Sequence, residues 1–468
     1  MSPRRASAVR DERGVALPLA LIALVLLSGL LVAFLIMGGL EPSIAANQND
    51  VAAARYVAEA GIEWAFDQLA LNPNWNGFLA TSGGVMVAGQ ALPGLPNASG
   101  TYAAQIRNDN QAGDAALTGL PIDGGVVGGN PATDTNGAVV LTASGTYRGV
   151  TRQIQVVVRR VAIPPFAGTY TMPGAQSDWL ATNVNFNIDG RDYFCTTNCN
   201  NSDFAQRTYG LNADQSKMKY GIATQTGSQQ NTNPQITYEA RVEQGLNSAT
   251  KRSNVIGKDQ TGAAASTTGY NTVAPDGGVD PTVMQNFLNA LAAFSSTQVL
   301  QSTMACPMVL TGNTTGAYAN QATLTNGCGV NQTVDLGTRQ NPKLVYFRGE
   351  LDPTSTFTGL RLRDNIQGSG ILVIEDGDLR TAGSLQWDGI VIVTGRYVSS
   401  IFDTGSNSTI FGATVSNETT WNEGGNRNQT PYYDGWFGAS AVNLRYSQEA
   451  IDLVQRRLLF RMSTWREL

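Results

Sequence analysis

The sequence contains no histidine, and this absence excludes several classes of active site. Without histidine the chain cannot form a Ser-His-Asp or Cys-His catalytic arrangement or a histidine-ligated metal site. Charged residues make up only 14% of the chain, whereas glycine is abundant, with 51 residues. This composition is more typical of an exported, β-rich protein with many turns than of a cytosolic enzyme. The 468 residues, 42% of them apolar, are enough for two or three domains with hydrophobic cores.

The longest apolar run, Val15 to Met37, carries no charged residue. As a helix it would span about 35 Å, which is enough to cross a bilayer. Residues 1–14 contain two acidic residues but four basic ones, Arg4, Arg5, Arg10 and Arg13. The positive-inside rule therefore predicts one membrane crossing, with residues 1–14 in the cytoplasm and the rest of the chain outside.

Pro18 distinguishes between three fates of this segment. A secretory signal would be cut near the small residues Ser43 and Ala45, but the apolar run is longer than a signal core. In an uncleaved helix, Pro18 would remove a hydrogen bond to the carbonyl of Gly14 and clash with it. If the chain is cut after Gly14, the helix begins at Val15 and Pro18 occupies the first turn, where no amide partner is needed. Cleavage at Gly14 is the favoured interpretation, and an uncleaved anchor remains the alternative.

These residues, together with "NQNDVAAARYVAEAGIEWAFDQL", resemble the type IV pilin class. Within that class they resemble the PilX family of minor pilins and its relative, the K-type pseudopilin of type II secretion. The resemblance covers about residues 10–72, and "AEAG" at 58–61 is its most specific local feature. It implies that a prepilin peptidase cuts between Gly14 and Val15, that Val15 is N-methylated, and that the chain is a single-pass inner-membrane protein with its bulk in the periplasm before assembly.

The chain departs from major pilins at the fifth mature residue, where the family usually has glutamate and this sequence has Leu19. In the family that glutamate pairs with the N-terminal amine of a neighbouring subunit, so its absence argues against a repeating filament subunit. The resemblance implies other minor pilins as partners, with a tip adhesin as a further candidate. We expect a minor pilin or pseudopilin that helps to initiate assembly and sits at the filament tip or the cell surface.

The first domain is predicted to be an α+β pilin-like module. Beyond the membrane, apolar residues recur every three or four positions from Val51 to Leu69, which indicates that the helix continues. The segments 101–107 and 137–161 read as strands, and the second contains a turn at Arg148 and Gly149. We expect these strands to form a small antiparallel sheet under the helix, with 108–136 as a loop.

After a linker at 161–168, a second, mainly β domain is predicted. "GILVIEDGDL" begins at Gly370, "GIVIVTGRYV" at Gly389 and "TIFGATVSN" at Thr409, and "KLVYFRGEL" at 343–351 is a more distant copy. The period of Ile371, Ile390 and Ile410, near twenty residues, favours a parallel β-helix, or β-solenoid, over an ordinary β-sandwich. Segments 281–294 and 448–460 read as helices. The predicted organisation is a leader at 1–14, a membrane segment at 15–40, the pilin-like module at 41–163, the β-rich domain at 164–440, and a C-terminal helix and tail at 441–468.

The four cysteines are Cys195, Cys199, Cys306 and Cys328. Their spacings, C-x3-C and C-x21-C, do not suit a four-thiolate zinc site, which prefers two short hairpins. Outside the cytoplasm, disulfides are the favoured interpretation. Sequence neighbours suggest the pairs 195 with 199 and 306 with 328, although four cysteines allow three pairings.

No catalytic residue, cofactor or metal site is predicted. The acids between Glu375 and Asp378, with Asp388 predicted one coil later at a similar position, could line the groove of a carbohydrate-active enzyme or bind calcium. Corner positions and a solvated surface explain them more simply. Arg361 or Arg380 beside Glu375 would favour the enzyme.

DNA is the remaining class of partner. The net charge of −5 becomes −7 once the leader is removed, which disfavours a polyanion. Binding would depend on a local basic patch, for which the candidates are Arg148, Arg152, Arg159 and Arg160. A surface module that binds DNA or acts as an adhesin therefore remains an alternative function.

Overall fold

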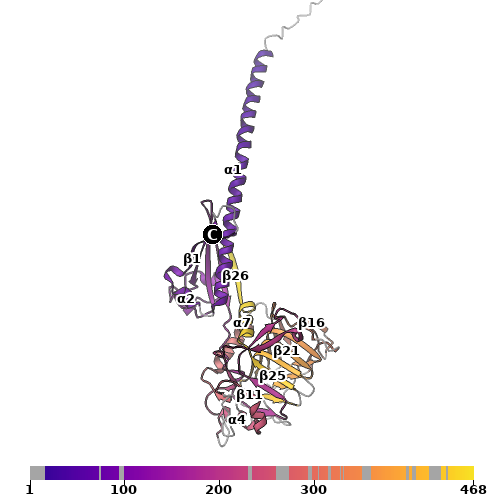
Figure 1. Cartoon of the computed structure of the whole chain (residues 1–468). Coiled ribbons are helices and arrows are strands. Elements are labelled where there is room, and N and C mark those ends of the chain that lie inside the picture. Colours follow the sequence, from indigo (N-terminus) through magenta and orange to yellow (C-terminus); the bar gives the residue numbers. More distant parts are fainter. Residues whose placement is uncertain are drawn as a thin grey trace, which may run out of the picture. The chain divides into compact units, whose positions relative to one another are not determined.

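The chain divides into two compact units, each described by itself (Figure 1). Unit 1 comprises the residues up to Val158 together with Met462–Leu468, and unit 2 comprises Arg159–Arg461. The computed structural model describes residues 16–72, 75–93, 100–229, 235–259, 273–292, 298–303, 305–314, 318–326, 328–329, 331–349, 360–396, 400–402, 407–420, 434–438 and 441–468.

Unit 1 is a long helix, α1 (Ala16–Leu71), packed on a small antiparallel sheet. The sheet has the strand order β1-β2-β3-β4-β26. Its strands are β1 (Val85–Ala91), β2 (Gly100–Asn108), β3 (Ala138–Tyr147), β4 (Val150–Arg160) and β26 (Phe460–Glu467). Short helices α2 (Asn76–Leu79) and α3 (Asp114–Thr118) lie in the connections. The predicted helix on a small sheet is confirmed.

Helix and sheet approach closely because small residues face each other. Ala54, Ala58 and Ala65 of α1 are fully buried on the side that faces the sheet. At Gly145 of β3, an added Cβ would lie 2.2 Å from the backbone nitrogen of Ala58, so a larger residue would push the helix away. The β3–β4 hairpin turns at Arg148 (φ 46°) and Gly149 (φ 83°), which confirms the predicted turn and is the backbone geometry that a two-residue hairpin requires.

Unit 2 contains two large sheets in its described residues. The larger sheet follows the order β11-β7-β25-β23-β21-β19-β17-β13, with β5, β10 and β12 attached, and the smaller sheet follows β16-β15-β14-β18-β20-β22-β24-β6. The strands of the larger sheet are β5 (Gly168–Met172), β7 (Phe186–Asp189), β10 (Tyr220–Thr224), β11 (Val255–Ile256), β12 (Val273–Pro275), β13 (Gln298–Gln301), β17 (Lys343–Arg348), β19 (Asn365–Glu375), β21 (Ser384–Gly395), β23 (Asn407–Glu418) and β25 (Ala441–Tyr446). Those of the smaller sheet are β6 (Trp179–Ala181), β14 (Met308–Thr311), β15 (Gln321–Asn326), β16 (Asn331–Asp335), β18 (Leu360–Arg363), β20 (Leu379–Thr381), β22 (Ser400–Phe402) and β24 (Gly435–Phe437).

Each face of the larger sheet contributes to a hydrophobic core. One core combines residues of both sheets, such as Leu372 and Val391 of the larger and Leu360 and Leu379 of the smaller. The opposite face of the larger sheet, which includes Ile390, is covered by helices α6 (Pro281–Ala292) and α7 (Gln448–Arg457). Ordinary amphipathic patterning explains both helices, and the two predicted helical segments are confirmed within a few residues. Helices α4 (Tyr238–Gly245) and α5 (Ala249–Ser253) complete the unit, and β8 (Tyr193–Thr197) pairs with β9 (Thr208–Leu211).

A column of glycines marks the repeat that the sequence indicated. Parallel pairing places Gly370 of β19 beside Gly389 of β21 and Gly389 beside Gly412 of β23. Ile371 and Ile390 are paired as expected, but the partner of Ile390 on β23 is Ala413, so the predicted alignment with Ile410 is wrong. The glycines are therefore aligned across all three strands, whereas the isoleucines are not. The connection from β21 to β23 is longer than the one from β19 to β21, so the spacing between equivalent positions increases.

The C-terminal segment differs from the expected helix and tail. Helix α7 ends at Arg457, and the chain then forms β26, which pairs with β4 in the sheet of unit 1. The backbone amide of Leu468 donates to the carbonyl of Gln153 at 3.0 Å. The sheet of unit 1 therefore takes one edge strand from a segment that follows unit 2 in the sequence.

Candidate functional site

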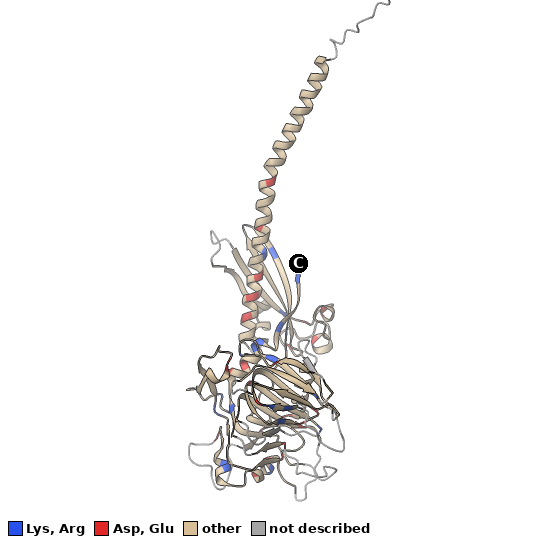
Figure 2. Ribbon diagram, turned by 90° about the vertical axis from the view of Figure 1, so that its right-hand side faces the viewer, with Lys and Arg blue, Asp and Glu red and all other residues tan. Residues whose placement is uncertain are grey.

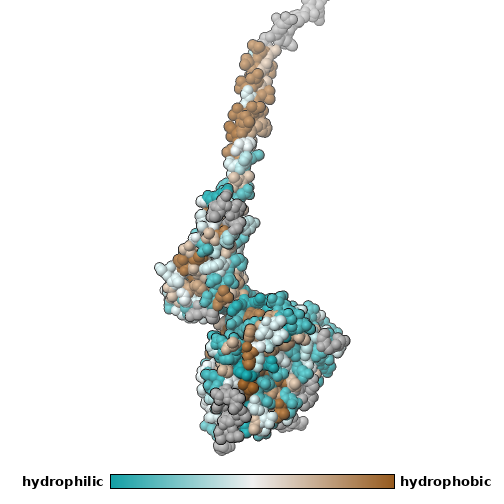
Figure 3. All heavy atoms as spheres, in the orientation of Figure 1, coloured by the Kyte–Doolittle hydropathy of each residue, from teal (hydrophilic) through white to brown (hydrophobic). Residues whose placement is uncertain are grey.

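The N-terminal part of α1 is the first candidate functional feature. Residues 16–40 contain no Lys, Arg, Asp or Glu, and this stretch of the helix is tan in Figure 2 and brown in Figure 3. Every residue from Ala16 to Asn49 is exposed. Among the described residues, α1 is long and apolar enough to cross a membrane, which is consistent with membrane anchoring.

Leu19 is exposed near the start of α1, and Pro18 lies within its first turn. The predicted cleavage residues Gly14 and Val15 lie outside the described residues. Cleavage after Gly14 stays a prediction, which rests on the first four amides of a helix having no partner within it.

A groove lies beside α1 at the level where the helix meets the sheet. Its cavity volume is about 600 Å³, and its lining comes from α1, β4 and β26: Asn47, Gln48, Val51, Ala52, Arg55, Tyr56, Glu59, Arg152 and Glu467. The guanidinium of Arg55 donates to Glu59 at 3.1 Å and lies 5.1 Å from the ring centre of Trp465. The groove is a polar, charge-balanced surface whose lining includes the exposed aromatic side chain of Tyr56.

The predicted basic patch is partly neutralised by acids. Arg148 lies 3.7 Å from Asp50, and Arg152 lies 3.9 Å from Glu467. All four side chains are at least partly exposed, so each ion pair contributes little to stability. Arg159 and Arg160, at the end of β4, are half-buried and belong to unit 2. The four arginines are thus divided between the two units, and two of them have an acid beside them.

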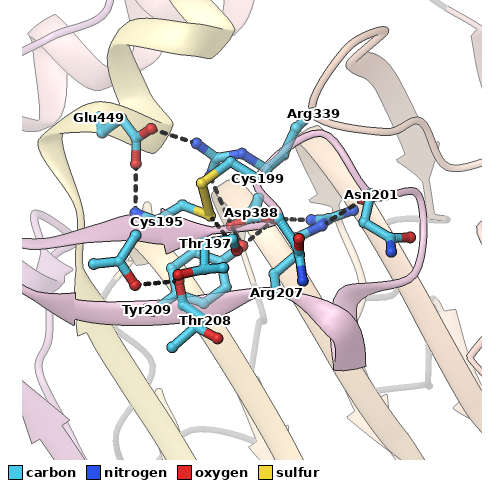
Figure 4. The surroundings of a disulfide bond; sticks show 12 residues. Cys195, Thr197, Cys199, Asn201, Arg207, Thr208, Tyr209, Arg339, Asp388 and Glu449 are labelled. Carbon is cyan, nitrogen blue, oxygen red and sulfur yellow. Dashed lines mark hydrogen bonds and ion pairs between the residues drawn. A yellow bond between two sulfur atoms is a disulfide. The ribbon is translucent and has the colours of Figure 1, made fainter.

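The four cysteines form two disulfides, Cys195–Cys199 and Cys306–Cys328. The first bond closes the end of β8, and Figure 4 shows it above the larger sheet. The backbone amide of Cys195 donates to Glu449 of α7 at 2.8 Å. This contact ties the disulfide-bonded hairpin to the helix that covers the sheet.

Asp388 is the centre of a buried ionic network next to this disulfide (Figure 4). Its carboxylate is 1% exposed and accepts hydrogen bonds from Arg207 and from the hydroxyl of Tyr209, the latter at 2.6 Å. Arg339 lies 3.3 Å from the same carboxylate and also donates to Glu449 at 2.6 Å. The network therefore links β9, β21 and α7 through charged side chains.

Two opposing effects set the ionisation of this network. Burial raises the pKa of Asp388 above its ordinary value, whereas the guanidinium groups of Arg339 and Arg207 act in the opposite direction. Burial, and then the charge of Asp388, raise the pKa of Tyr209, which keeps its hydroxyl protonated as a donor. Each oxygen of Asp388 has protein donors, an arrangement suited to holding segments together and not to proton transfer with a substrate.

The structure separates Asp388 from the other acids with which the sequence grouped it. In the strand register Asp388 lies beside Ser369, whereas Glu375 lies beside Thr394, so the predicted similar position is wrong. Glu375 is paired with Arg348 at 2.5 Å, and Asp378 is buried. Arg361 and Arg380, expected as partners of Glu375, are register neighbours on the smaller sheet instead.

A second buried acidic cluster was missed by sequence reasoning. Asp178, Glu418 and Asp434 are all less than 5% exposed. The amide of Asp178 donates to Asp434 at 2.7 Å, and Arg241 forms an ion pair with Asp178. Burial, and then the charges of Glu418 and Asp178, raise the pKa of Asp434 well above its ordinary value. No sequence signal joins these residues, because Asp178 lies more than 200 positions before Glu418 and Asp434.

Comparisons with known proteins give a likeness among solved structures. No protein-family model matches the sequence, and no curated protein matches it. Among solved structures, the chain is similar to the competence-associated pilin ComZ from Thermus thermophilus, at 12% identity and a TM-score of 0.21, over 90% of this chain and 97% of that one. A TM-score this low means that the two structures do not superpose as wholes, so no residue role is taken from that protein.

Proposed function

We propose that this protein is a minor subunit of a type IV pilus-like filament, anchored by α1 in the inner membrane before assembly and located at the filament tip afterwards. The observation that carries the proposal is the division of α1. Its residues 16–49 are exposed and mostly apolar, whereas Ala54, Ile62 and Leu69 are buried against the sheet. One continuous helix thus supplies both a membrane-competent segment and the core of a small domain.

In this proposal unit 2 is a β-solenoid that faces outward. The chain passes alternately through the two sheets, from β19 to β20, β21, β22, β23 and β24. Each of these strands pairs in parallel with the next strand of its own sheet, as stacked coils require. The acids of this unit that we singled out are paired or buried, which favours a binding or structural role over catalysis.

The tip location follows from size and from Leu19. Unit 2 runs from Arg159 to Arg461 and would crowd a shaft built from small pilin heads. A subunit at the tip has no subunit above it, so a glutamate at the fifth mature position would have no amine to pair with. Leu19 at this position therefore loses no ion pair. The amine of Val15, freed by a prepilin peptidase, stays available to the next subunit. Other minor pilins are the expected neighbours, and a tip adhesin is a further one.

Localisation on sheared filaments tests this function. Immunogold labelling against residues 169–461 should mark filament ends only, and deletion of the protein should lower filament number more than filament length. A Leu19→Glu variant provides the matched control. If unit 2 determines the location, the antibody should still mark only the filament ends when this variant replaces the parent protein. Regular labelling along the shafts would rule out the tip location, and absence from filaments altogether would rule out a filament subunit.

A further inference from the structure

The β2–β3 loop of unit 1, residues 109–137, concentrates negative charge. It contains four aspartates and neither lysine nor arginine. One of the four, Asp114, forms two hydrogen bonds with the guanidinium of Arg107, near the end of β2, at 2.6 and 2.8 Å. This pair balances one acid of the loop with a cation from the neighbouring strand. The environment of the other acids decides whether they are ionised.

Asp109 is completely buried at the point where the loop leaves β2. Its Oδ2 accepts a hydrogen bond from the side-chain amide of Asn136 at 2.9 Å. Its Oδ1 is also buried, and in the described part of the chain this atom has no hydrogen-bond partner. A charged oxygen in such a place costs far more free energy than a neutral carboxyl group, because no donor replaces the water it has lost.

The neighbouring charges act in the same direction as burial. Burial, and then the charges of Asp123 and Asp134, raise the pKa of Asp109 from its ordinary 3.8 to about 6, against the lowering effect of the hydrogen bond from Asn136. Either a proton or a metal ion would remove the unfavourable charge. Among the described residues, no three Asp, Glu, Cys or His side chains are placed to share a metal ion. The geometry therefore favours a proton on Asp109.

Asp109 also lies where distant parts of the loop meet. The side-chain amide of Asn136, which donates to Asp109, also donates to the carbonyl of Pro121 at 3.2 Å. The backbone amide of Asp123 donates to the carbonyl of Asp109 at 3.3 Å. These contacts join the start, middle and end of the loop. Shortly after Asp123, the loop exposes two adjacent valines at 126–127.

We propose that a proton on Asp109 holds the β2–β3 loop closed. With the proton, Asp109 is neutral, and its contacts with Asn136 and Asp123 keep the parts of the loop together. Without the proton, a buried negative charge faces two further acids, so the loop opens more often and the valines at 126–127 are held less firmly.

The direction of the pH effect follows from proton linkage. The closed loop binds the proton more tightly than the open loop, in which Asp109 has its ordinary pKa of 3.8. Opening therefore becomes easier as the pH rises from this value to about 6, and it changes little at higher pH. The loop is held at acidic pH and loosened at neutral and alkaline pH.

Hydrogen exchange of the full-length protein in detergent micelles, followed by mass spectrometry and corrected for the intrinsic effect of pH on amide exchange, tests the proposal. In peptides from residues 109–137 we expect the opening equilibrium constant to rise on the order of fiftyfold between pH 4 and pH 7. The Asp109→Asn variant is neutral at every pH, so its loop should stay closed and lose this dependence. The matched control Asp67→Asn removes an exposed acid of α1 and should behave like the parent.

Peptides from β2 and β3 show whether the variants keep the fold of unit 1. If Asp109→Asn unfolds them, Asp123→Asn replaces it: this variant removes one repulsive charge, so the pH at which opening levels off should fall. A parent loop whose opening does not depend on pH would overturn the proposal, as would an unchanged dependence in Asp109→Asn. If Ca²⁺ closes the loop at pH 8 in the parent but not in Asp109→Asn, a metal ion and not a proton neutralises Asp109, and the proposal is wrong.

Discussion

Asp388 shows how single residues hold unit 2 together. A buried carboxylate is stable only when donors or opposite charges replace the water it has lost. Here Arg207 and Tyr209 come from the segment around β9, and Arg339 comes from the segment before β17. The aromatic ring of Tyr209 also stacks on Phe411 at 3.7 Å between ring centres, next to the network. Charge and packing together fix the disulfide-bonded hairpin on the sheet.

We expect Asp388→Asn to destabilise unit 2 by about 3–5 kcal/mol, because it removes the counter-charge of buried Arg207 and leaves buried Arg339 with Glu449 alone. Urea unfolding followed by near-UV circular dichroism measures the loss. The matched control is Asp335→Asn, which removes an exposed ion pair with Lys343 and should cost about 0–1 kcal/mol. Equal unfolding midpoints for the two variants would show that the buried network contributes no more than a surface pair.

The sequence could not reveal this network. A carboxylate at a corner or on a solvated surface is the simpler interpretation of Asp388 from the sequence alone. Its partners lie at positions 207, 209 and 339, and only the stacking of distant segments brings them together. The two disulfides, by contrast, join the sequence neighbours that their spacing suggested.

At the scale of the strands, the glycine column explains how β19, β21 and β23 stack so closely. Gly370, Gly389 and Gly412 adopt φ values of 130°, 131° and 137°, which favour glycine. An added Cβ at Gly389 would lie 2.1 Å from the carbonyl oxygen of Gly370, and one at Gly412 would lie 1.9 Å from that of Gly389. Each strand therefore approaches its neighbour at a position where a side chain has no room.

Gly389→Ala should destabilise unit 2 by more than about 3 kcal/mol, because the new methyl group meets backbone in a strained conformation. Thermal unfolding and the yield of folded protein measure the effect. Gly277→Ala is the control, since nothing lies within 4 Å of its added Cβ and it should change stability by less than about 1 kcal/mol. A Gly389→Ala protein that melts with the parent would mean that the strands separate easily at this position.

Local sequence signals predicted the helices, strands and turns better than they predicted which strand positions pair with each other. The Arg148–Gly149 turn, the apolar stripe of α1 and the helix that starts at Pro281 depend on residues close in sequence, and all three are present. The third repeat was aligned on Ile410 because isoleucine spacing was the clearest signal. Strand register depends instead on Gly412, after a connection of different length. The repeat period alone could not show which residue type stays in register from one strand to the next.

At the scale of the whole chain, unit 1 is closed by residues that follow unit 2. The chain leaves unit 1 after Val158 and returns at Met462. The returning strand β26 covers the edge of β4, and its Glu467 lies 4.0 Å from Arg55 and 3.9 Å from Arg152. Sequence periodicity carries no information about such a pairing, because 299 residues lie between the end of β4 and the start of β26. Folding of unit 1 is therefore completed only when Met462–Leu468 have been synthesised.

Deletion of Met462–Leu468 should loosen unit 1 without unfolding unit 2. The deletion removes the strand paired with β4, so backbone groups of β4, such as the carbonyl of Gln153 that accepts from Leu468, lose their partners, and a new sheet edge becomes available for aggregation. Hydrogen exchange followed by mass spectrometry should show lower protection in peptides from β4 and from residues 50–71 of α1, while peptides from β19, β21 and β23 keep theirs. Replacing Trp465 by alanine in the intact chain serves as the control, because it removes the contact with Arg55 but keeps the backbone pairing. Unchanged protection of β4 after the deletion would show that the four remaining strands and α1 fold without the C-terminal strand, and that β26 is an attachment to unit 1 and not a part of its core.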